Sequence, residues 1–339
     1  MTTASSVKPS DPPTSSPRIG TSAAPEAEDV PILPTPETGS ALWRIGGVIR
    51  TMRPHQWLKN AFVLAPVFFA KDVFSPPLLL TAMMAFGVFC LLAGAVYTMN
   101  DIVDVEGDRA HPVKRFRPIP SGRVPVPVAK GLAVGLVVVS LGAAAVIDLR
   151  FAAVALAYFV LNVGYSFRLK NVPFLDVSCI SAGFVLRVVA GGFATRIPVS
   201  SYLLACTALL ALFLGFGKRR HEIAQAEGNP KKQRAVLNAY SPRALTTALA
   251  LTAAATVATY LAYTLDPQTR ALFHSDKLWL TTLFTVFGMV RFLQLVTSRP
   301  KAESPTQEML RDVPFVLNLV LYVVLVFVIV YALKPGVMP

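Results

Sequence analysis

The strongest constraint on this chain is a series of long apolar runs, each close to the length that crosses a bilayer. A membrane-spanning helix needs about 20 mostly apolar residues. The 339-residue chain is 54% hydrophobic and 15% charged, whereas a soluble domain carries about 25% charged residues. The sequence therefore predicts an all-α membrane protein with nine spans, at residues 58–75, 78–99, 124–147, 151–167, 174–195, 199–217, 243–265, 278–297 and 313–333.

The Lys and Arg residues are distributed unevenly between the two faces that these spans create. If the N-terminus is cytoplasmic, 25 of the 32 lie on the cytoplasmic face, six lie on the opposite face, and Arg187 lies inside the fifth span. Cytoplasmic loops of membrane proteins carry an excess of Lys and Arg. The distribution predicts a multi-pass protein of the inner (plasma) membrane, with its N-terminus and active site in the cytoplasm. The net charge of +13 then reflects topology, and no nucleic-acid partner is expected.

The first residues differ from the rest of the chain. Residues 1–42 are rich in Pro, Ser, Thr and Ala and lack an apolar run that could serve as a signal peptide. We expect a disordered cytoplasmic tail here, and a nine-helix membrane catalytic domain over residues 43–335. The three cysteines, Cys90, Cys179 and Cys206, each lie inside an apolar run and are expected to pack as small hydrophobic side chains.

Acidic residues gather where the second predicted span ends. Asn100, Asp104 and Asp108 recur every four residues and would form one stripe on a helix, with Asp101 three residues before Asp104. Such close carboxylates repel one another, and charge near hydrocarbon is costly. A divalent cation would stabilise them, since Mg²⁺ takes oxygen ligands and shares its coordination with substrate phosphates. We therefore expect these four residues to bind Mg²⁺, with Asp101 in a supporting role.

Positively charged residues and a histidine follow this stripe within nine positions: Arg109, His111, Lys114, Arg115 and Arg117. Carboxylates that bind Mg²⁺, next to cations that bind phosphate oxygens, suit the departure of a diphosphate group. The metal and the cations neutralise the charge that develops as the bond breaks. We interpret the region as a magnesium–diphosphate site, with Asp104, Asp108 and Lys114 as catalytic candidates; the alternative is a solvated acidic helix end.

The stretch from Asn100 to Asp108 reads NDxxDxxxD and resembles the first signature of the UbiA prenyltransferase superfamily. The resemblance implies a nine-helix intramembrane enzyme whose active site opens to the cytoplasm. Ordinary members use a prenyl diphosphate donor and carry a second acidic motif, DxxxD or a relative. The corresponding stretch here holds one acidic residue, Asp176, together with Tyr165 and Lys170.

Four stretches resemble the decaprenyl-phosphate phosphoribosyltransferase branch of this superfamily. They are Arg53–Asn60, the His111–Ile119 extension of the acidic motif, the YxxxxKxxxxxD pattern of Tyr165, Lys170 and Asp176, and Gly217–Arg219. This resemblance implies phosphoribosyl pyrophosphate as donor, a polyprenyl (decaprenyl) phosphate as acceptor, and a product that is a precursor for cell-wall arabinan. The nucleophile would be an anionic phosphate, so no general base is required, and catalysis reduces to positioning two anions and stabilising the leaving diphosphate.

Most substrate-binding candidates carry a cationic or phenolic side chain. Arg187 stands out because it lies in mid-span, where a charged side chain normally pairs with an anion. We expect Arg187 to bind a donor or acceptor phosphate, with an interhelical polar contact as the alternative. The full set is Lys59, Tyr97, Lys114, Arg117, Tyr165, Lys170, Asp176, Arg187, Lys218 and Arg219.

Two other functions compete with the phosphoribosyltransferase. A prenyltransferase with an aromatic acceptor would use the same scaffold, but the missing second DxxxD speaks against it. A transporter with an intramembrane ion site would explain Arg187 and the acidic stripe. It would not explain the cations after Asp108, and the sequence has no internal repeat of the kind expected of transporters. The sequence is compatible with a homo-oligomer but does not specify one.

Overall fold

The computed structural model describes residues 40–70, 75–226, 239–298, 308–309 and 311–332. Over these ranges the regular elements are all helical and no strand forms. Among the described residues, eight helices are long and apolar enough to cross a membrane. The predicted fold class, an all-α membrane protein, is therefore confirmed. Most of the predicted tail, residues 1–39, lies outside the described ranges, as do residues 333–335 at the end of the predicted domain.

The spanning helices follow the predicted runs closely. They are α3 (Pro76–Val103), α5 (Val126–Ile147), α6 (Leu149–Phe167), α7 (Leu175–Thr195), α8 (Ser201–Ala226), α9 (Pro242–Leu265), η6 (Leu278–Thr281) continuing into α11 (Thr282–Ser298), and α13 (Val313–Phe327) continuing into the π-helical turn η7 (Val328–Ala332). Shorter elements are α1 (Ala41–Thr51), η1 (Pro54–Leu64), α2 (Ala65–Phe69), α4 (Val105–Ala110), η2 (Lys114–Phe116), η3 (Leu169–Asn171) and α10 (Pro267–Phe273).

The first predicted span, residues 58–75, differs from the others. It consists of the 3₁₀ helix η1 followed by the short helix α2, and residues 71–74 lie outside the described ranges. Pro66 removes a backbone donor from the middle of this segment, and Lys59 and Asn60 place polar groups in it. A 3₁₀ helix rises more per residue than an α-helix, so η1 still covers considerable length. A total of nine spans is consistent with this arrangement and stays a prediction.

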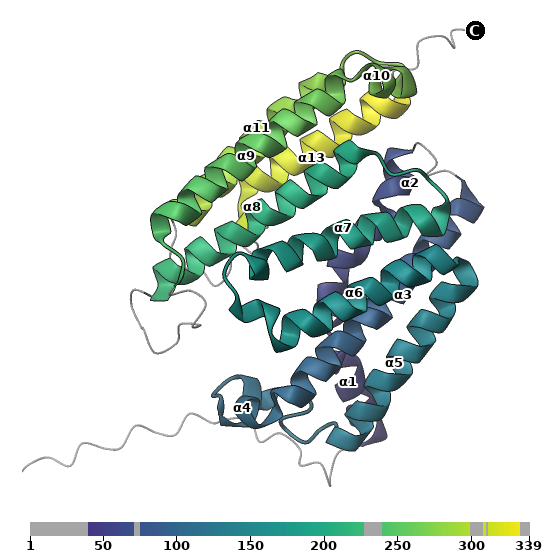
Figure 1. The fold of residues 1–339 in the computed structure, drawn as a ribbon, viewed down its shortest axis with the longest axis vertical. Helices are drawn as coiled ribbons and strands as arrows, with labels where there is room; N and C mark the ends of the chain where they lie inside the picture. Colours follow the sequence, from purple (N-terminus) through teal and green to yellow (C-terminus); the bar gives the residue numbers. More distant parts are fainter. Residues whose placement is uncertain (1–39, 71–74, 227–238, 299–307, 310, 333–339) are drawn as a thin grey trace, which may run out of the picture.

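The helices pack largely in chain order. Helix α3 contacts α5, α5 contacts α6, α6 contacts α7, α7 contacts α8, and α8 contacts α9, while η1 packs between α3 and α7. Figure 1 shows α8, α9, α11 and α13 together on one side of the molecule and α3, α5, α6 and α7 on the other. We call the end where α3, α6 and α8 finish and α5, α7 and α9 begin the polar end, because the candidate site residues gather there.

Side-chain caps and prolines start several helices. Ser241 accepts a hydrogen bond from the Ala244 amide, and Pro242 opens α9. Asp312 caps α13 through the Phe315 amide at 3.0 Å, and Asp148 caps α6 through the Arg150 amide at 2.7 Å. Caps of this kind satisfy backbone donors that a helix leaves unpaired. They fix where each span begins, and hence the level of the residues around its end.

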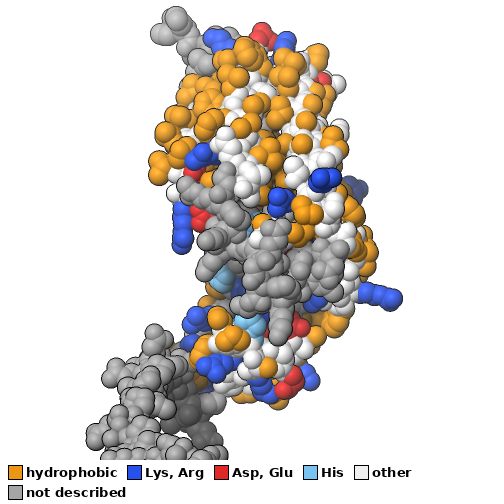
Figure 2. Space-filling view, turned by 90° about the vertical axis from the view of Figure 1, so that its left-hand side faces the viewer, with side chains coloured by type: hydrophobic (Ala, Val, Ile, Leu, Met, Phe, Trp, Pro, Cys, Tyr) orange, Lys and Arg blue, Asp and Glu red, His pale blue; other side chains and the backbone are white. Residues whose placement is uncertain are grey.

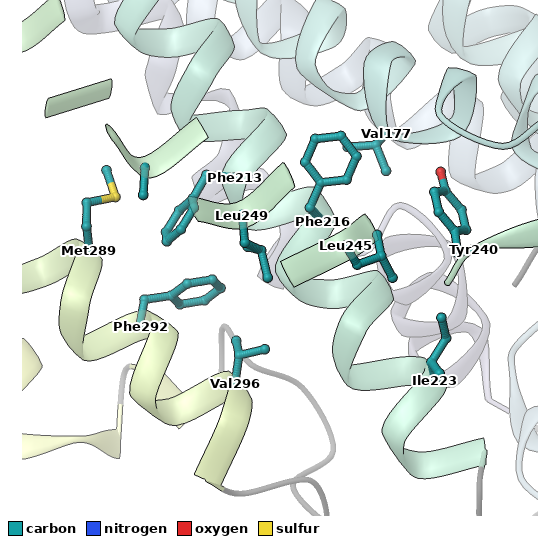
Figure 3. Close-up of a cluster of buried hydrophobic side chains, with 11 residues drawn as sticks. Val177, Phe213, Phe216, Ile223, Tyr240, Leu245, Leu249, Met289, Phe292 and Val296 are labelled. Atoms are coloured by element: carbon teal, nitrogen blue, oxygen red, sulfur yellow. The ribbon is translucent and has the colours of Figure 1, made fainter. Parts of the chain in front are cut away.

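One buried core joins the two halves of the bundle. Figure 3 shows side chains from α7, α8, α9 and α11 converging, and Phe213 of α8 lies 4.8 Å from Phe292 of α11 between ring centroids. A second core joins η1, α3, α6 and α7, where Val63, Phe89 and Phe151 are fully buried. Packing of this kind drives helix association in a bilayer, because lipid tails are as apolar as the side chains themselves.

The outer surface matches a lipid environment. Large apolar side chains are exposed on α3, α5, α6, α7, α9, α11 and α13, especially on α5 and α13, whereas α8 exposes none among its described side chains. In Figure 2, hydrophobic side chains cover most of the upper part of the face shown, and Lys and Arg side chains are more frequent in its lower part. An exposed apolar belt of this size would be a liability in water, and it places the bundle in a membrane.

Gly191 of α7 provides a test of the close packing against η1. A Cβ atom at this position would overlap the backbone carbonyl oxygen of Val63. We expect Gly191→Ala to push η1 from α7 and to lower stability by about 1–3 kcal/mol, as over-packing does. The measurement is the thermal midpoint of the detergent-solubilised protein by size-exclusion chromatography. The control is Gly135→Ala on α5, where a Cβ would meet open space; an equal midpoint for both variants would contradict the packing.

Candidate functional site

The acidic motif lies at the polar end of α3. Helix α3 ends at Val103 and α4 begins at Val105, with Asp104 between them. The Asp104 amide donates to the Asn100 carbonyl at 2.9 Å, and the Asp108 amide donates to the Asp104 carbonyl at 2.8 Å. Helical hydrogen bonding thus continues through the junction, and the four-residue spacing inferred from the sequence holds in the backbone.

Burial divides the four predicted metal ligands into two pairs. Asp101 and Asp108 are 2% and 3% exposed, which is consistent with a seven-residue spacing that returns to the same helix face. Arg117 Nη1 lies 2.6 Å from Asp108 Oδ2 and 3.3 Å from Asp101 Oδ1. Arg53 Nη2 lies 2.5 Å from Asp101 Oδ1, and Lys114 Nζ lies 3.7 Å from Asp108 Oδ1. These three cations compensate the two buried carboxylates.

The other pair, Asn100 and Asp104, carries side-chain oxygen atoms that could bind a metal ion. Asp104 is exposed and Asn100 is half-buried, and neither side chain makes a hydrogen bond or ion pair within the described ranges. The described residues contain no group of three or more His, Cys, Asp or Glu side chains placed to hold a metal. Carboxylate and amide oxygens are nevertheless the ligand types that Mg²⁺ prefers, and Mg²⁺ often completes its shell with substrate phosphates. The donor set fits the ion, and the ligand assignment stays a prediction.

Arg53 is a site residue that the sequence analysis included only as the first member of the Arg53–Asn60 stretch. It adopts a left-handed conformation, with φ of 52°, between α1 and η1. This turn directs its guanidinium to Asp101 and places it over the Tyr97 ring, 5.1 Å from the centroid. Its position immediately before Pro54, where helical conformation is disfavoured, was the available signal that the chain turns here.

Arg187 is buried in the middle of the bundle and makes only neutral contacts. Its Nε donates to Asn60 Oδ1 at 2.8 Å, its Nη2 donates to Tyr158 Oη at 2.7 Å, and its Nη1 donates to the Gly183 carbonyl at 3.0 Å. The Asn60 amide reaches on to the Phe89 carbonyl of α3 at 3.3 Å. This cluster joins η1, α3, α6 and α7, which matches the interhelical alternative. The guanidinium charge, however, has no carboxylate within ion-pair distance among the described residues.

Lys59 lies within electrostatic range of three other cations. Lys218, Arg187 and Arg53 all repel its ammonium group, and no carboxylate of the described residues pairs with it. Tyr97 lies within electrostatic range of both Arg187 and Arg53. The structure therefore brings predicted residues from η1, α3, α7 and α8 together beside the acidic motif. The concentration of positive charge there exceeds what nearby carboxylates compensate.

Asp176 and Arg219, both predicted to bind substrate, instead bind each other. Both are buried, and Arg219 Nε lies 2.6 Å from Asp176 Oδ2. Glu222 Oε2 accepts from Arg219 Nη1 at 2.5 Å, and the Tyr240 hydroxyl donates to Asp176 Oδ1 at 2.5 Å. The same hydroxyl accepts from the Phe174 amide. This geometry favours a role in joining the starts of α7 and α9 to the end of α8, so direct substrate contact by either residue lacks support.

The neighbours of this ion pair include the remaining predicted residues. Tyr165 lies within electrostatic range of Arg219, and Lys218 Nζ lies 4.0 Å from Glu222 Oε1. Lys170 is half-buried in η3, and none of its contacts ties it to the acidic motif. Burial, together with the hydrogen bond to Asp176, raises the pKa of the Tyr240 hydroxyl above its ordinary value. That hydroxyl therefore stays protonated and keeps donating to Asp176 throughout the neutral range.

An apolar pocket of about 320 Å³ lies between the helices of the bundle. Its walls come from α2, α8, α9, α11 and α13, and Phe62 of η1 lies at one side. The Phe62 ring packs edge-on against Phe184 at 4.9 Å, and Arg187 lies 5.1 Å from the centroid of the same Phe184 ring. Phe62 and Phe184 thus connect the cationic cluster to the pocket. The pocket could not be located from the sequence, because its walls come from separate segments of the chain.

Comparison with known proteins gives the family. The sequence profile of the UbiA prenyltransferase family matches residues 61–320, which is most of the chain. This chain belongs to the UbiA prenyltransferase family. The resemblance first carried by the acidic motif is thereby confirmed.

Two curated relatives of this UbiA-family chain are named decaprenyl-phosphate phosphoribosyltransferase. The protein from Corynebacterium glutamicum is 40% identical over 224 residues, covering 65% of this chain and 68% of that protein. The protein from Mycolicibacterium smegmatis is 38% identical over 229 residues, covering 66% and 72%. A solved structure of a UbiA homolog from Archaeoglobus fulgidus, bound to DMAPP and Mg²⁺, superposes with a TM-score of 0.60 at 19% identity, covering 85% of this chain and all of that one. That likeness shows the shared fold.

The buried Asp176–Arg219 pair gives this UbiA-family chain a test that separates support from substrate binding. Asp176→Asn leaves Arg219 with only Glu222 as a charged partner, and we expect a loss of about 3–5 kcal/mol, as when one member of a buried pair is removed. The double variant Asp176→Asn with Arg219→Met removes both charges and should regain part of that loss. The thermal midpoints of the single and double variants form the comparison. Unchanged midpoints together with lost substrate binding would favour the original prediction.

Proposed function

We propose that this chain transfers phosphoribose from phosphoribosyl pyrophosphate to a polyprenyl (decaprenyl) phosphate and releases diphosphate. The product would serve as a precursor for cell-wall arabinan. The names of the curated relatives support this activity, and so do the four sequence stretches that first suggested it. The observation that carries the proposal is the surplus of cations beside the acidic motif, since both substrates are phosphate anions.

The excess positive charge beside the acidic motif lies on two residues. Arg53, Lys114 and Arg117 already pair with Asp101 and Asp108. Lys59 and Arg187 have no carboxylate partner among the described residues, although Arg187 is buried. Lys59 is exposed, whereas the uncompensated charge of buried Arg187 lies in a low-dielectric setting and is costly. An incoming phosphate would relieve this cost, and it would form the short, charge-assisted hydrogen bonds that cations make with phosphate oxygens.

Magnesium fits the same region. Asn100 and Asp104 offer oxygen atoms free of other partners, and Asp101 and Asp108 lie on the adjacent helix face. A related protein of this fold was solved with Mg²⁺ bound. When bound, the ion supplies positive charge that stabilises the departing diphosphate. Arg117 and Lys114 would supply further charge to the same group, because both already point to Asp108.

The proposed reaction requires no proton transfer by the protein. An oxygen atom of the acceptor phosphate forms a bond to C1 of the ribose, and the bond between C1 and the diphosphate oxygen breaks, with the diphosphate keeping the electron pair. The nucleophile is already anionic, so no general base is needed. The contribution of Lys59, Arg187 and Lys218 is to hold two anions against their mutual repulsion.

The acceptor lipid has a matching place in the structure. We assign its prenyl chain to the apolar pocket between α2, α8, α9, α11 and α13. Phe62 and Phe184 lie between this pocket and Arg187, so a lipid chain in the pocket would bring its phosphate towards the cationic cluster. The distribution of Lys and Arg over the loops supports a cytoplasmic orientation for this polar end, in the inner membrane.

The second candidate activity is prenyl transfer to an aromatic acceptor. The family name, and a homolog solved with DMAPP bound, are the reasons to consider it. Prenyl diphosphate enzymes of the ordinary type need a second acidic motif. The single acidic residue in the corresponding stretch, Asp176, is fully buried and paired with Arg219. It is therefore poorly placed to bind a second metal ion, and phosphoribosyl transfer is favoured. The third alternative, transport, rests on Arg187 and the acidic motif, and the proposed enzyme already explains both.

The two activities can be separated in one assay. Purified protein in detergent with Mg²⁺ is incubated with labelled phosphoribosyl pyrophosphate and decaprenyl phosphate, and in parallel with labelled prenyl diphosphate and 4-hydroxybenzoate. We expect labelled lipid in the first mixture and no prenylated 4-hydroxybenzoate in the second. Product in the second mixture alone would overturn the proposal, and turnover in neither would favour transport.

Asp104 tests the metal assignment. Because Asp104 is exposed and has no partner among the described residues, Asp104→Ala should leave the thermal midpoint unchanged while abolishing turnover at every Mg²⁺ concentration. Glu106→Ala, which removes a neighbouring exposed carboxylate paired only with Arg109, is the matched control and should keep its activity. Normal turnover in Asp104→Ala would remove Asp104 from the site.

Lys59 tests the anion site. Removing a hydrogen-bonding charge from a phosphate contact costs about 1.5–3 kcal/mol, so Lys59→Met should raise the KM for phosphoribosyl pyrophosphate by about tenfold to a hundredfold. Lys130→Met, an exposed lysine at the same end of the bundle on α5, controls for the general loss of positive charge. Equal KM values for the two variants would show that Lys59 only follows the topology of the membrane.

A further inference from the structure

Helix α1 presents its apolar face outward. Leu42, Ile45 and Ile49 are 80%, 55% and 52% exposed. In an α-helix with 3.6 residues per turn these three positions fall on one side. The spanning helices already account for the membrane-embedded surface, and α1 is too short to cross a bilayer. Its exposed apolar stripe therefore needs a separate explanation.

The opposite side of α1 is small and polar, and it faces the protein. Gly47 and Thr51 are buried. Arg123 lies directly against Gly47, donates to the Trp43 carbonyl, and stacks 4.8 Å from the centroid of the Trp43 ring. An amphipathic helix on a soluble protein buries its apolar stripe. Helix α1 does the reverse, as expected when the outer side meets an apolar medium.

The depth of α1 places that side at the membrane boundary. Met52 directly follows the helix, and its side chain lies against Gly94 of α3. Gly94 is six residues from Asn100 at the polar end of α3, which is about 9 Å along the helix axis. Arg123, which holds the middle of α1, lies three residues before the start of α5. Helix α1 therefore lies beside the last turns of α3 and the segment that leads into α5, at the level where we expect lipid headgroups and the outermost acyl carbons.

The charge of α1 fits an anionic surface. Arg44 and Arg50 are exposed and flank the apolar stripe on its two sides, and the sequence of α1 contains no acidic residue. Interfacial helices combine a buried apolar stripe with flanking cations that bind anionic headgroups. A second copy of this chain would bring the same arginines towards each other, so like-charge repulsion disfavours that occupant.

We propose that α1 is an interfacial helix that inserts Leu42, Ile45 and Ile49 into a bilayer surface rich in anionic lipid. Helix α1 ends at Thr51, two residues before Arg53, which pairs with Asp101. Docking of α1 therefore also fixes the position of Arg53. The effect on catalysis rests on the proposed function, whereas the docking itself does not.

A fluorescent label reports the surroundings of the stripe directly. The full-length chain, with Cys90, Cys179 and Cys206 changed to Ala, carries one new cysteine labelled with an environment-sensitive NBD group. Ile45→Cys tests the stripe, and Leu42→Cys serves as a second site should the first variant fold poorly. Glu106→Cys on α4, whose side chain is 82% exposed, is the aqueous control. Each protein is placed in nanodiscs of phosphatidylglycerol and phosphatidylcholine.

Two quenchers then distinguish whether lipid, water or protein covers the apolar stripe of α1. We expect a doxyl-labelled lipid to remove most of the emission at residue 45 while aqueous iodide leaves it unchanged, with the opposite pattern at residue 106. Quenching at 45 by iodide alone would show that the stripe faces water and would overturn the proposal. Resistance to both quenchers would show that protein covers the stripe, which would overturn it equally. No readout here depends on turnover, so failure of the proposed activity leaves the test intact.

The anionic preference is tested in the same nanodiscs. Omitting phosphatidylglycerol should reduce lipid quenching at residue 45, and the variant with Arg44→Ser and Arg50→Ser should lose that dependence on lipid charge. Quenching that is identical in both lipid compositions for the unaltered arginines would contradict the assignment of an anionic surface.

Discussion

A charge held near hydrocarbon must be compensated, and in this chain that constraint acts first on Asp101 and Asp108. Asp101 is buried near the end of α3 and Asp108 on α4; Arg117 bridges the two carboxylates, and Arg53 also binds Asp101. The pairing ties three segments together: the turn after α1, the end of α3 and the loop that leads to α5. The same two arginines therefore hold the architecture around the site and supply charge to it.

Not every cation near the site is compensated by a carboxylate, and these remaining positive charges are the basis of the functional proposal. Lys59 and Arg187 lie within electrostatic range of one another, and neither pairs with a carboxylate among the described residues. Arg187 is stabilised by Asn60, Tyr158, the Gly183 carbonyl and the Phe184 ring, all of them neutral groups. By contrast, Asp176 and Arg219 satisfy each other and so contribute to packing. A site of this composition is suited to binding anions. The adjoining apolar pocket makes a lipid phosphate a suitable second substrate.

Local pattern predicted much of this structure from the sequence. The apolar runs placed eight spanning helices, and the four-residue spacing of Asn100, Asp104 and Asp108 is present in the hydrogen bonding of α3 and α4. The spacing could not show which carboxylates are buried, because burial depends on Arg53, 48 residues before Asp101. The first predicted span is the weakest in the sequence, because Lys59, Pro66 and Lys71 interrupt its apolar residues, and its described part forms η1 and α2.

Long-range pairing explains the remaining differences. The sequence identified Asp176 and Arg219 as charged residues near helix ends, and it could not show that they lie against each other across 43 positions. Arg187 was recognised as unusual from its place in mid-span, yet its partner Asn60 lies 127 positions away. Periodicity reports the face of one helix, whereas these contacts depend on how helices pack, which composition does not encode.

We infer that the cations around Lys59 form an anion site that recognises diphosphate. The most direct measurement is the thermal midpoint of the purified protein as a function of inorganic diphosphate with Mg²⁺, against sulfate at matched ionic strength. A ligand that binds only the folded state stabilises it by about 2.7 kcal/mol at a hundred times its Kd. We expect the midpoint to rise with diphosphate and not with sulfate. No rise, or an equal rise with sulfate, would contradict it.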